Sequence, residues 1–158
     1  MKVSVICVGK IKEKFFTEAI KEYAKRMSRF AEFEIIEIPD ERIPDNSSEK
    51  ENELIKKREG DKILSKIKSQ SYVISLCIEG RTLDSIELAD VIKTTCLHTS
   101  HICFIIGGSL GLSDEVKQRS DLRLSFGRMT LPHQLMRVVL SEQIYRAFMI
   151  NSGGAYHK

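Results

Sequence analysis

The sequence has no tryptophan, only three prolines and no apolar run longer than five residues. A membrane-spanning helix needs about 20 apolar residues, so the sequence predicts none. The opening segment, Met1 to Val8, is typical of a β-strand and runs directly into charged sequence, unlike a signal peptide. We therefore expect a cytoplasmic protein.

Cysteine and histidine are scarce, with four of each. No CxxC pair occurs among Cys7, Cys77, Cys96 and Cys103, and three of these lie in apolar, strand-like runs. Such cysteines in a cytosolic chain are expected to be reduced and packed in the core. The histidines show neither HExxH nor another metal-ligand spacing. The sequence therefore predicts neither disulfides nor a bound metal.

The formal net charge is only +3, although the charges are segregated along the chain. Residues 10–30 carry seven basic and three acidic side chains, and residues 117–137 carry five basic and one acidic. Between them, residues 31–61 carry eleven acidic and five basic side chains. Basic segments are typical of surfaces that bind a phosphate backbone. Solvated helix faces give the same pattern, so charge alone leaves both interpretations open.

The apolar pattern alternates between strand and helix spacing. The predicted strands cover residues 2–8, 33–38, 72–78, 101–106 and 122–126. The predicted helices cover residues 13–29, 49–67, 83–97, a short segment from 113, and 133–150. Gly60 weakens the pattern of the second helix. This order predicts an α/β protein with a mainly parallel sheet flanked by helices, in a single domain over residues 1–158.

Two turns at the expected carboxyl ends of strands are candidate ligand sites, because open α/β sheets bind ligands there. Residues 107–111 are rich in glycine, but they lack both the GxGxxG dinucleotide fingerprint and the GK[ST] of a phosphate loop. Residues 125–134 are extended before Pro132, which leaves backbone groups free for a polar ligand. In that segment the side chains of Met129 and Leu131 can pack against an apolar ring of the ligand. Ordinary turns packed on the core are the alternative for both segments.

The last predicted helix, residues 133–150, is apolar around most of its circumference and must be buried on more than one side. A two-fold subunit interface would bury it, so we expect a homodimer. Glu142 and Arg146 stand one turn apart, which also fits a simple ion pair. The tail after this helix, residues 153–158, ends in an aromatic ring, an imidazole and an ammonium group. A frayed end is the alternative to a role for these groups.

Together, these motifs resemble the ribosomal RNA large subunit methyltransferase H family, which belongs to the SPOUT methyltransferases. The resemblance covers essentially the whole chain and is weakest near residues 44–53. The matching segments are Val8-Gly9-Lys10, Glu37-Ile38-Pro39, Ile106-Gly107-Gly108, Gly111-Leu112-Ser113, Leu131-Pro132-His133, Arg137-Val138, Glu142 to Ala147, and Tyr156-His157.

The resemblance implies a SPOUT-type α/β fold with a C-terminal trefoil knot, and a homodimer. It implies methyl transfer from S-adenosylmethionine to N3 of a pseudouridine in helix 69 of 23S ribosomal RNA, within the assembled 70S ribosome. It implies neither DNA nor a membrane as partner. By position, the residues expected to bind the cofactor are Leu76, Gly107, Phe126, Gly127, Arg128, Met129, Thr130 and Leu131.

Methylation at N3 of a uracil ring also requires loss of the N3 proton, which a positioned base would assist. The catalytic candidates are His133, Arg137, Glu142, Arg146, Tyr156 and His157. His133 or Glu142 is expected to act as the base, and the two arginines to bind or polarise the RNA. The two tail residues, with Lys158, are expected to close over the site from the partner subunit.

Two other classes of protein fit part of the sequence. A nucleotide- or flavin-binding α/β protein would also place glycine turns at strand ends, although the missing GxGxxG disfavours NAD. A non-catalytic ribosome-associated factor would share the basic surface without binding S-adenosylmethionine. Without the resemblance, residue chemistry supports only a dimeric α/β domain that binds a nucleotide-like ligand, and it leaves RNA binding open.

Overall fold

Five short apolar segments form one sheet in the computed structural model, which describes residues 1–158. The strands are β1 (Lys2–Val8), β2 (Glu32–Ile38), β3 (Tyr72–Thr82), β4 (His101–Ile106) and β5 (Leu122–Ser125). They lie in the order β2-β1-β4-β3-β5, and each strand is parallel to its neighbours. The predicted parallel α/β architecture is therefore confirmed.

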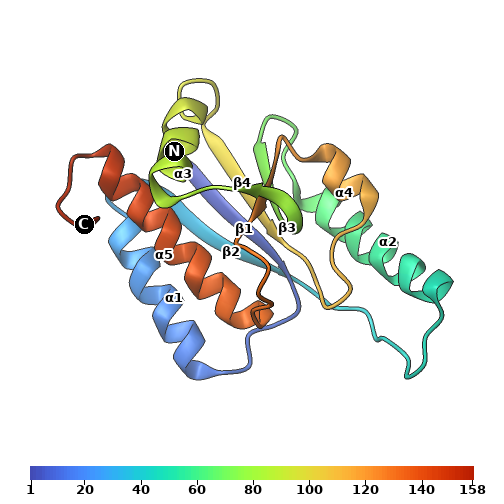
Figure 1. Cartoon of the computed structure of the whole chain (residues 1–158). Helices are drawn as coiled ribbons and strands as arrows, with labels where there is room; N and C mark the ends of the chain where they lie inside the picture. The colour runs from blue at the N-terminus through green and yellow to red at the C-terminus, as the bar shows by residue number, and fades with distance from the viewer.

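Helices cover both faces of this sheet (Figure 1). They are α1 (Lys14–Met27), α2 (Glu49–Lys66), α3 (Ser85–Thr95), α4 (Asp114–Arg119) and α5 (His133–Asn151). On one face α5 packs between α1 and α3, and on the other face α2 packs against α4. None of these helices is both long and apolar enough to cross a membrane.

The central strands β1 and β4 are largely apolar without alternation because both of their faces are buried. Along β1, Val5 and Cys7 belong to the core beneath α1, α3 and α5, whereas Ile6 and Val8 belong to the core beneath α2 and α4. All four cysteines are free thiols, as predicted. Cys7 and Cys103 are fully buried, whereas the other two are only half-buried.

Two local features differ from the sequence pattern. The helix α2 runs through Gly60 without a break. Glycine at this position lets α2 approach the start of α4, because a Cβ on Gly60 would clash with Ser113 Oγ. The strand β3 continues to Thr82, four residues beyond the predicted end, and shifts register against β5 between Leu76 and Arg81. The last part of β3 is polar and exposed, so the sequence there lacks the apolar pattern that predicts a strand. This extension carries β3 to the carboxyl edge of the sheet.

Candidate active site

The loops that leave the carboxyl ends of the parallel strands enclose a cavity of about 420 Å³. Residues 107–112, after β4, and residues 124–127 and 129–131, at and after the end of β5, form much of its wall. The extended part of β3 adds residues 76–79. Half of the 22 lining residues are hydrophobic. The volume and the mixed lining are typical of small-molecule sites, which span roughly 300–1,000 Å³.

Most of the residues predicted to bind a cofactor line this cavity. They are Leu76, Gly107, Phe126, Gly127, Met129, Thr130 and Leu131. Arg128 is exposed and is not part of the lining, so the geometry gives no support for a cofactor contact at that position. The structure thus gathers residues that lie up to 55 positions apart, from Leu76 to Leu131, around one hollow.

Two glycines fix the shape of the cavity wall. A Cβ on Gly107 would lie 2.9 Å from Leu112 Cδ2 and 3.1 Å from the backbone carbon of Gly111, so a side chain there would force the two arms of that turn to shift. Gly127 has a φ of +108°, a conformation that residues with a side chain rarely adopt. Its amide donates a hydrogen bond to Ser125 Oγ at 3.2 Å. The backbone of both loops is thereby held beside the cavity, where its polar groups can contact a ligand.

Charged side chains at the cavity were missed from the sequence. Lys56, Lys117 and Glu79 all belong to the lining. Lys117 Nζ lies 2.5 Å from Glu79 Oε1, and this hydrogen bond raises the pKa of the lysine and lowers the pKa of the glutamate. These residues come from α2, α4 and the hidden end of β3, so only the tertiary structure brings them together. The basic character of residues 117–137 was the one available hint.

His133 is the catalytic candidate that the structure places at the cavity. It is the first residue of α5 and part of the cavity lining. Burial lowers the pKa of its imidazole, and the nearby Arg137 cation lowers that pKa further. The ring is therefore neutral at pH 7 and able to accept a proton.

Arg137 lies one turn further along α5, and its side chain is only 1% exposed. Nη1 donates to Glu37 Oε2 at 2.9 Å, and Nη2 donates to the carbonyls of Val8 at 3.1 Å and Gly9 at 2.9 Å. These contacts hold the guanidinium inside the protein, where it has no surface to offer RNA. The geometry favours a positioning role for this arginine over the direct RNA contact that we expected.

The other four candidates form a separate cluster on the far half of α5. Glu142 Oε1 accepts hydrogen bonds from Arg146 Nε at 3.0 Å, Arg146 Nη2 at 2.5 Å and the Tyr156 hydroxyl at 3.1 Å. His157 Nδ1 lies 3.2 Å from Arg146 Nη1. The ion pair that the helical spacing suggested is present. The tail is folded against α5 rather than frayed.

In this cluster the Glu142 carboxylate is already engaged by hydrogen-bond donors, so it is a poor candidate for the base. The second oxygen of Glu142 accepts from Gln143 Nε2 at 2.8 Å, so both carboxylate oxygens are occupied. Burial, together with the hydrogen bond to Glu142, raises the pKa of Tyr156 to about 12 and keeps the phenol neutral. The hydrogen bond to the same carboxylate raises the pKa of Arg146. Between the two base candidates, the geometry favours His133.

Comparison with known proteins decides the family. A family model described as "Predicted SPOUT methyltransferase" matches residues 1–157. Proteins named "Ribosomal RNA large subunit methyltransferase H" from Lactococcus lactis subsp. cremoris (strain SK11) and Clostridioides difficile (strain 630) are 60% and 57% identical to this chain. Both alignments cover 100% of each chain. The chain belongs to the ribosomal RNA large subunit methyltransferase H family.

Membership of this SPOUT family confirms the resemblance found in the sequence motifs. A solved structure, "The structure of a probable methylase family protein from Haemophilus influenzae Rd KW20", has a TM-score of 0.53 at 12% identity. The match covers 99% of this chain and 70% of that one. At such low identity the likeness concerns the fold alone, and it agrees with the SPOUT-type α/β architecture. Membership in a methyltransferase family also disfavours a flavin-binding protein and a non-catalytic factor.

A single chain of this SPOUT methyltransferase does not bring all the candidates together. His133 and Arg146 are 13 positions apart on the same helix. At 1.5 Å per residue, that spacing places them about 20 Å apart along the helix axis. One chain therefore supplies the cavity with His133, while the cluster of Glu142, Arg146, Tyr156 and His157 lies elsewhere.

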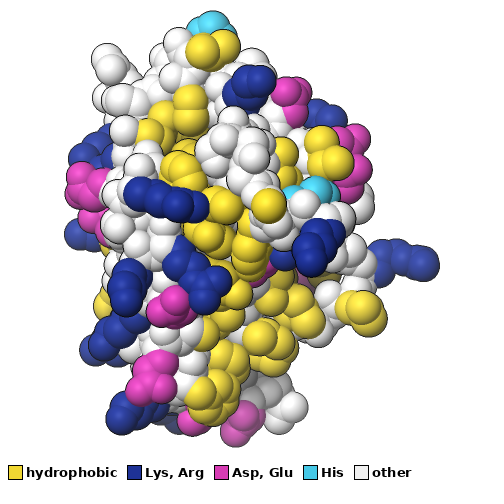
Figure 2. Space-filling view, turned by 90° about the vertical axis from the view of Figure 1, so that its left-hand side faces the viewer, with side chains coloured by type: hydrophobic (Ala, Val, Ile, Leu, Met, Phe, Trp, Pro, Cys, Tyr) yellow, Lys and Arg dark blue, Asp and Glu magenta, His cyan; other side chains and the backbone are white.

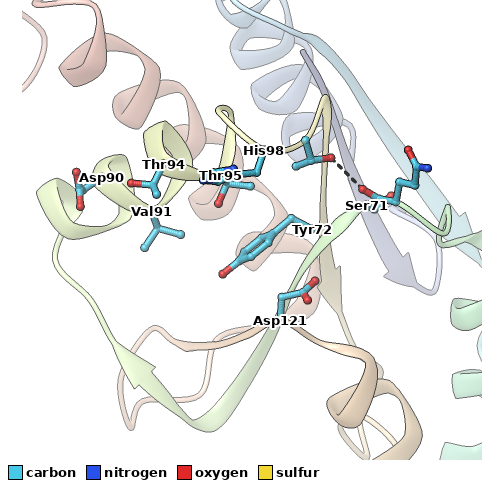
Figure 3. Close-up of a pocket in the computed structure, with 10 residues that line it drawn as sticks. Ser71, Tyr72, Asp90, Val91, Thr94, Thr95, His98 and Asp121 are labelled. Carbon is cyan, nitrogen blue, oxygen red and sulfur yellow. Dashed lines mark hydrogen bonds between the residues drawn. The ribbon is translucent and has the colours of Figure 1, made fainter.

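A second cavity, of about 460 Å³, lies at the opposite edge of the sheet (Figure 3). Its lining is mostly polar and includes Tyr72, Thr94 and Asp121. The last of these is already used within the protein, since Asp121 Oδ2 accepts from the Val73 amide at 2.7 Å and pairs with Arg119 at 3.3 Å. None of the candidate residues reaches this cavity. The cavity at the carboxyl edge is therefore the candidate active site.

No group of three or more His, Cys, Asp or Glu side chains is placed to hold a metal ion. At the candidate active site, His133 and Cys77 are the only histidine and cysteine in the lining, and Glu79 is paired with Lys117. That the protein works without a metal stays a prediction.

Proposed function

We propose that this protein transfers a methyl group from S-adenosylmethionine to the 23S ribosomal RNA of the large subunit. The acceptor is N3 of a pseudouridine in helix 69, on the assembled 70S ribosome, as the resemblance implies. One observation carries the proposal. Seven of the eight predicted cofactor residues line a single cavity, in a chain that is 60% identical over its full length to a protein named "Ribosomal RNA large subunit methyltransferase H".

The residues at the cavity fit S-adenosylmethionine. Leu76, Met129 and Leu131 offer apolar walls for a purine ring, and the extended backbone beside them offers donors and acceptors for its polar edge. The Lys117–Glu79 pair supplies both signs of charge for the amino and carboxyl groups of the methionine part. When bound, the cofactor supplies a methyl group activated by the positive charge on sulfur.

His133 is the proposed base. The neutral imidazole would accept the N3 proton, while bound S-adenosylmethionine would supply the methyl group and leave as the neutral thioether. Attack must be nearly in line with the breaking bond, so correct placement of the acceptor supplies much of the rate. A positioned base typically contributes about 10²- to 10⁴-fold.

The remaining candidates act in a homodimer. The half-buried Leu135 and Val138 belong to α5, and a continuous hydrophobic band flanked by basic side chains crosses the side of the molecule on which α1 and α5 lie (Figure 2). A two-fold partner would cover this band. It would also bring a second tail, with its tyrosine and histidine, toward the cavity and close the separation of about 20 Å along α5.

The same proposal includes a C-terminal trefoil knot, which rests on the resemblance, and a single domain over residues 1–158 in the cytoplasm, which rest on the sequence pattern. The test is to incubate the protein and labelled S-adenosylmethionine with 70S ribosomes, isolated 50S and 30S subunits, and free 23S RNA, all lacking this methylation. We expect label in 23S RNA from 70S ribosomes, and at least a hundredfold lower rate for His133→Asn. Label confined to 30S subunits, or none at all, would contradict the proposal.

A further inference from the structure

The backbone of the segment between β1 and α1, residues 9–13, is pinned to the rest of the protein. The Ile11 amide donates to Glu37 Oε2 at 2.8 Å, and the Lys12 amide donates to Gln134 Oε1 at 2.9 Å. The same glutamate is the partner of the buried guanidinium described above, which also binds two carbonyls at the end of β1. This segment is therefore a fixed part of the fold, even though its side chains face solvent.

The pinning places this segment next to the candidate active site. Gln134 belongs to the first turn of α5, between His133 and Met136, and both of these neighbours line the cavity. Figure 1 shows the connection from β1 to α1 beside the start of α5. The segment thus forms part of the rim that an RNA strand would meet on its way to the cavity.

The side chains of this segment are basic and largely unpaired. Residues 10–14 contain three lysines and one acidic residue, Glu13, and all four side chains are exposed. Lys10 and Lys12 form no ion pair, and the partner of Lys14 is the exposed Glu18 at 3.8 Å. Glu37, the carboxylate that the segment contacts, is neutralised by its arginine. The rim therefore carries a net positive charge, because Glu13 is the only acidic residue among its lysines and Lys10 and Lys12 form no ion pair.

Of the two helices that begin at this corner, α5 adds to the positive potential. It has neither a side-chain cap nor an acidic residue in its first turn. In contrast, α2, α3 and α4 each begin with a serine or aspartate cap and at least one acidic residue. At the start of α1 the N-cap residue is Glu13, whose carboxylate offsets the helix dipole. The partial positive charge at the uncapped start of α5 favours an anion.

We propose that Lys10 and Lys12, with the start of α5, bind backbone phosphates of the ribosomal RNA beside the nucleotide that enters the cavity. Gln134 is a positioning residue that holds this basic rim in place. The inference rests on the proposed function, because it assumes that the occupant of the rim is the RNA substrate. A fixed array of lysines suits phosphates because each contact releases condensed counterions from the RNA.

The test compares the double variant Lys10→Ala/Lys12→Ala with a matched control, Lys66→Ala/Lys68→Ala. The control removes two exposed lysines that form no ion pair, near the opposite edge of the sheet. We expect the first variant to bind 70S ribosomes about tenfold more weakly at ~0.1 M salt. The slope of log affinity against log salt should fall by about 1.4 to 1.8, which corresponds to two phosphate contacts. The affinity for S-adenosylmethionine should not change.

A third variant, Gln134→Leu, tests the position of the segment separately from the charge of its lysines. It keeps every lysine, so the salt slope should stay at the wild-type value while ribosome affinity falls about three- to tenfold, because the released segment must be ordered on binding. Equal losses for the rim and control variants would overturn the proposal, as would an unchanged salt slope in the rim variant. Binding is measured apart from methyl transfer. Suppose that the wild-type protein transfers no methyl group, but its ribosome binding still loses the expected salt slope in the rim variant. That result would refute the proposed function and leave the proposal of RNA binding by the rim standing.

Discussion

Glu37 is the countercharge of a buried arginine, so its neutralisation should cost stability. In Glu37→Gln the amide can still accept hydrogen bonds, but the Arg137 guanidinium, 1% exposed, loses its partner at 2.9 Å. Breaking a fully buried ion pair typically costs about 3–5 kcal/mol. The Glu37 side chain is 38% exposed. Since water screens the remaining charge there, we expect a loss of about 2 kcal/mol in the free energy of unfolding.

The assay is urea unfolding at pH 7, together with the melting temperature. For a chain of this size, about 2 kcal/mol corresponds to a fall in Tm of about 4–8 °C. The matched control is Glu22→Gln, which breaks the Arg26 pair of the same type at 2.8 Å, with side chains 51% and 44% exposed. This surface pair should contribute much less to stability, because water screens both of its charges. Equal losses in the two variants would refute the idea of a buried, structural guanidinium, as would an Arg137→Met variant that loses activity at unchanged stability.

Three further predictions concern the site. Gly107→Ala should weaken S-adenosylmethionine binding about tenfold, measured by calorimetry, because the new Cβ would lie 2.9 Å from Leu112 Cδ2; an unchanged Kd would show that this turn does not contact the cofactor. Deletion of residues 155–158 should abolish most methyl transfer and leave cofactor binding intact, and full activity in the shortened protein would exclude a role for the tail. Because the pKa of His133 is lowered from 6.5, kcat/KM should hold to below pH 6.5 and then fall as the imidazole gains a proton. His133→Asn should lack this acidic limb, and an identical pH profile in that variant would point to another base.

Much of the fold could be predicted from the sequence, because the apolar pattern of most segments matches their burial in the folded protein. The strands β1 and β4 are apolar on both faces, which is what a sheet covered on both sides requires. The end of β3 could not be predicted, since Glu79 and Arg81 are polar and exposed, and the pairing of Arg81 with Leu124 of β5 appears only in the folded sheet. Gly60 was misleading for a related reason, because the contact that needs glycine comes from the start of α4.

The site was accessible only in part. The glycine-rich turns predicted the place of the cavity, because the ends of strands and the glycines that follow them can be recognised from neighbouring residues in the sequence. The pairing of Lys117 with Glu79 joins residues 38 positions apart, and no local pattern announces it. The burial of Arg137 was also hidden, although an arginine within a helix that is apolar all round already implied either an interface or a buried partner. That partner, Glu37, is 100 positions away.

The most direct test of the account is to map the label after methyl transfer to 70S ribosomes. Two ribosome preparations are needed, one in which the target uridine has been isomerised to pseudouridine and one in which it has not. The account predicts a single label at N3 of one pseudouridine in helix 69 of 23S RNA, absent from the second preparation. A label elsewhere in the ribosome, or one that does not depend on isomerisation, would contradict it.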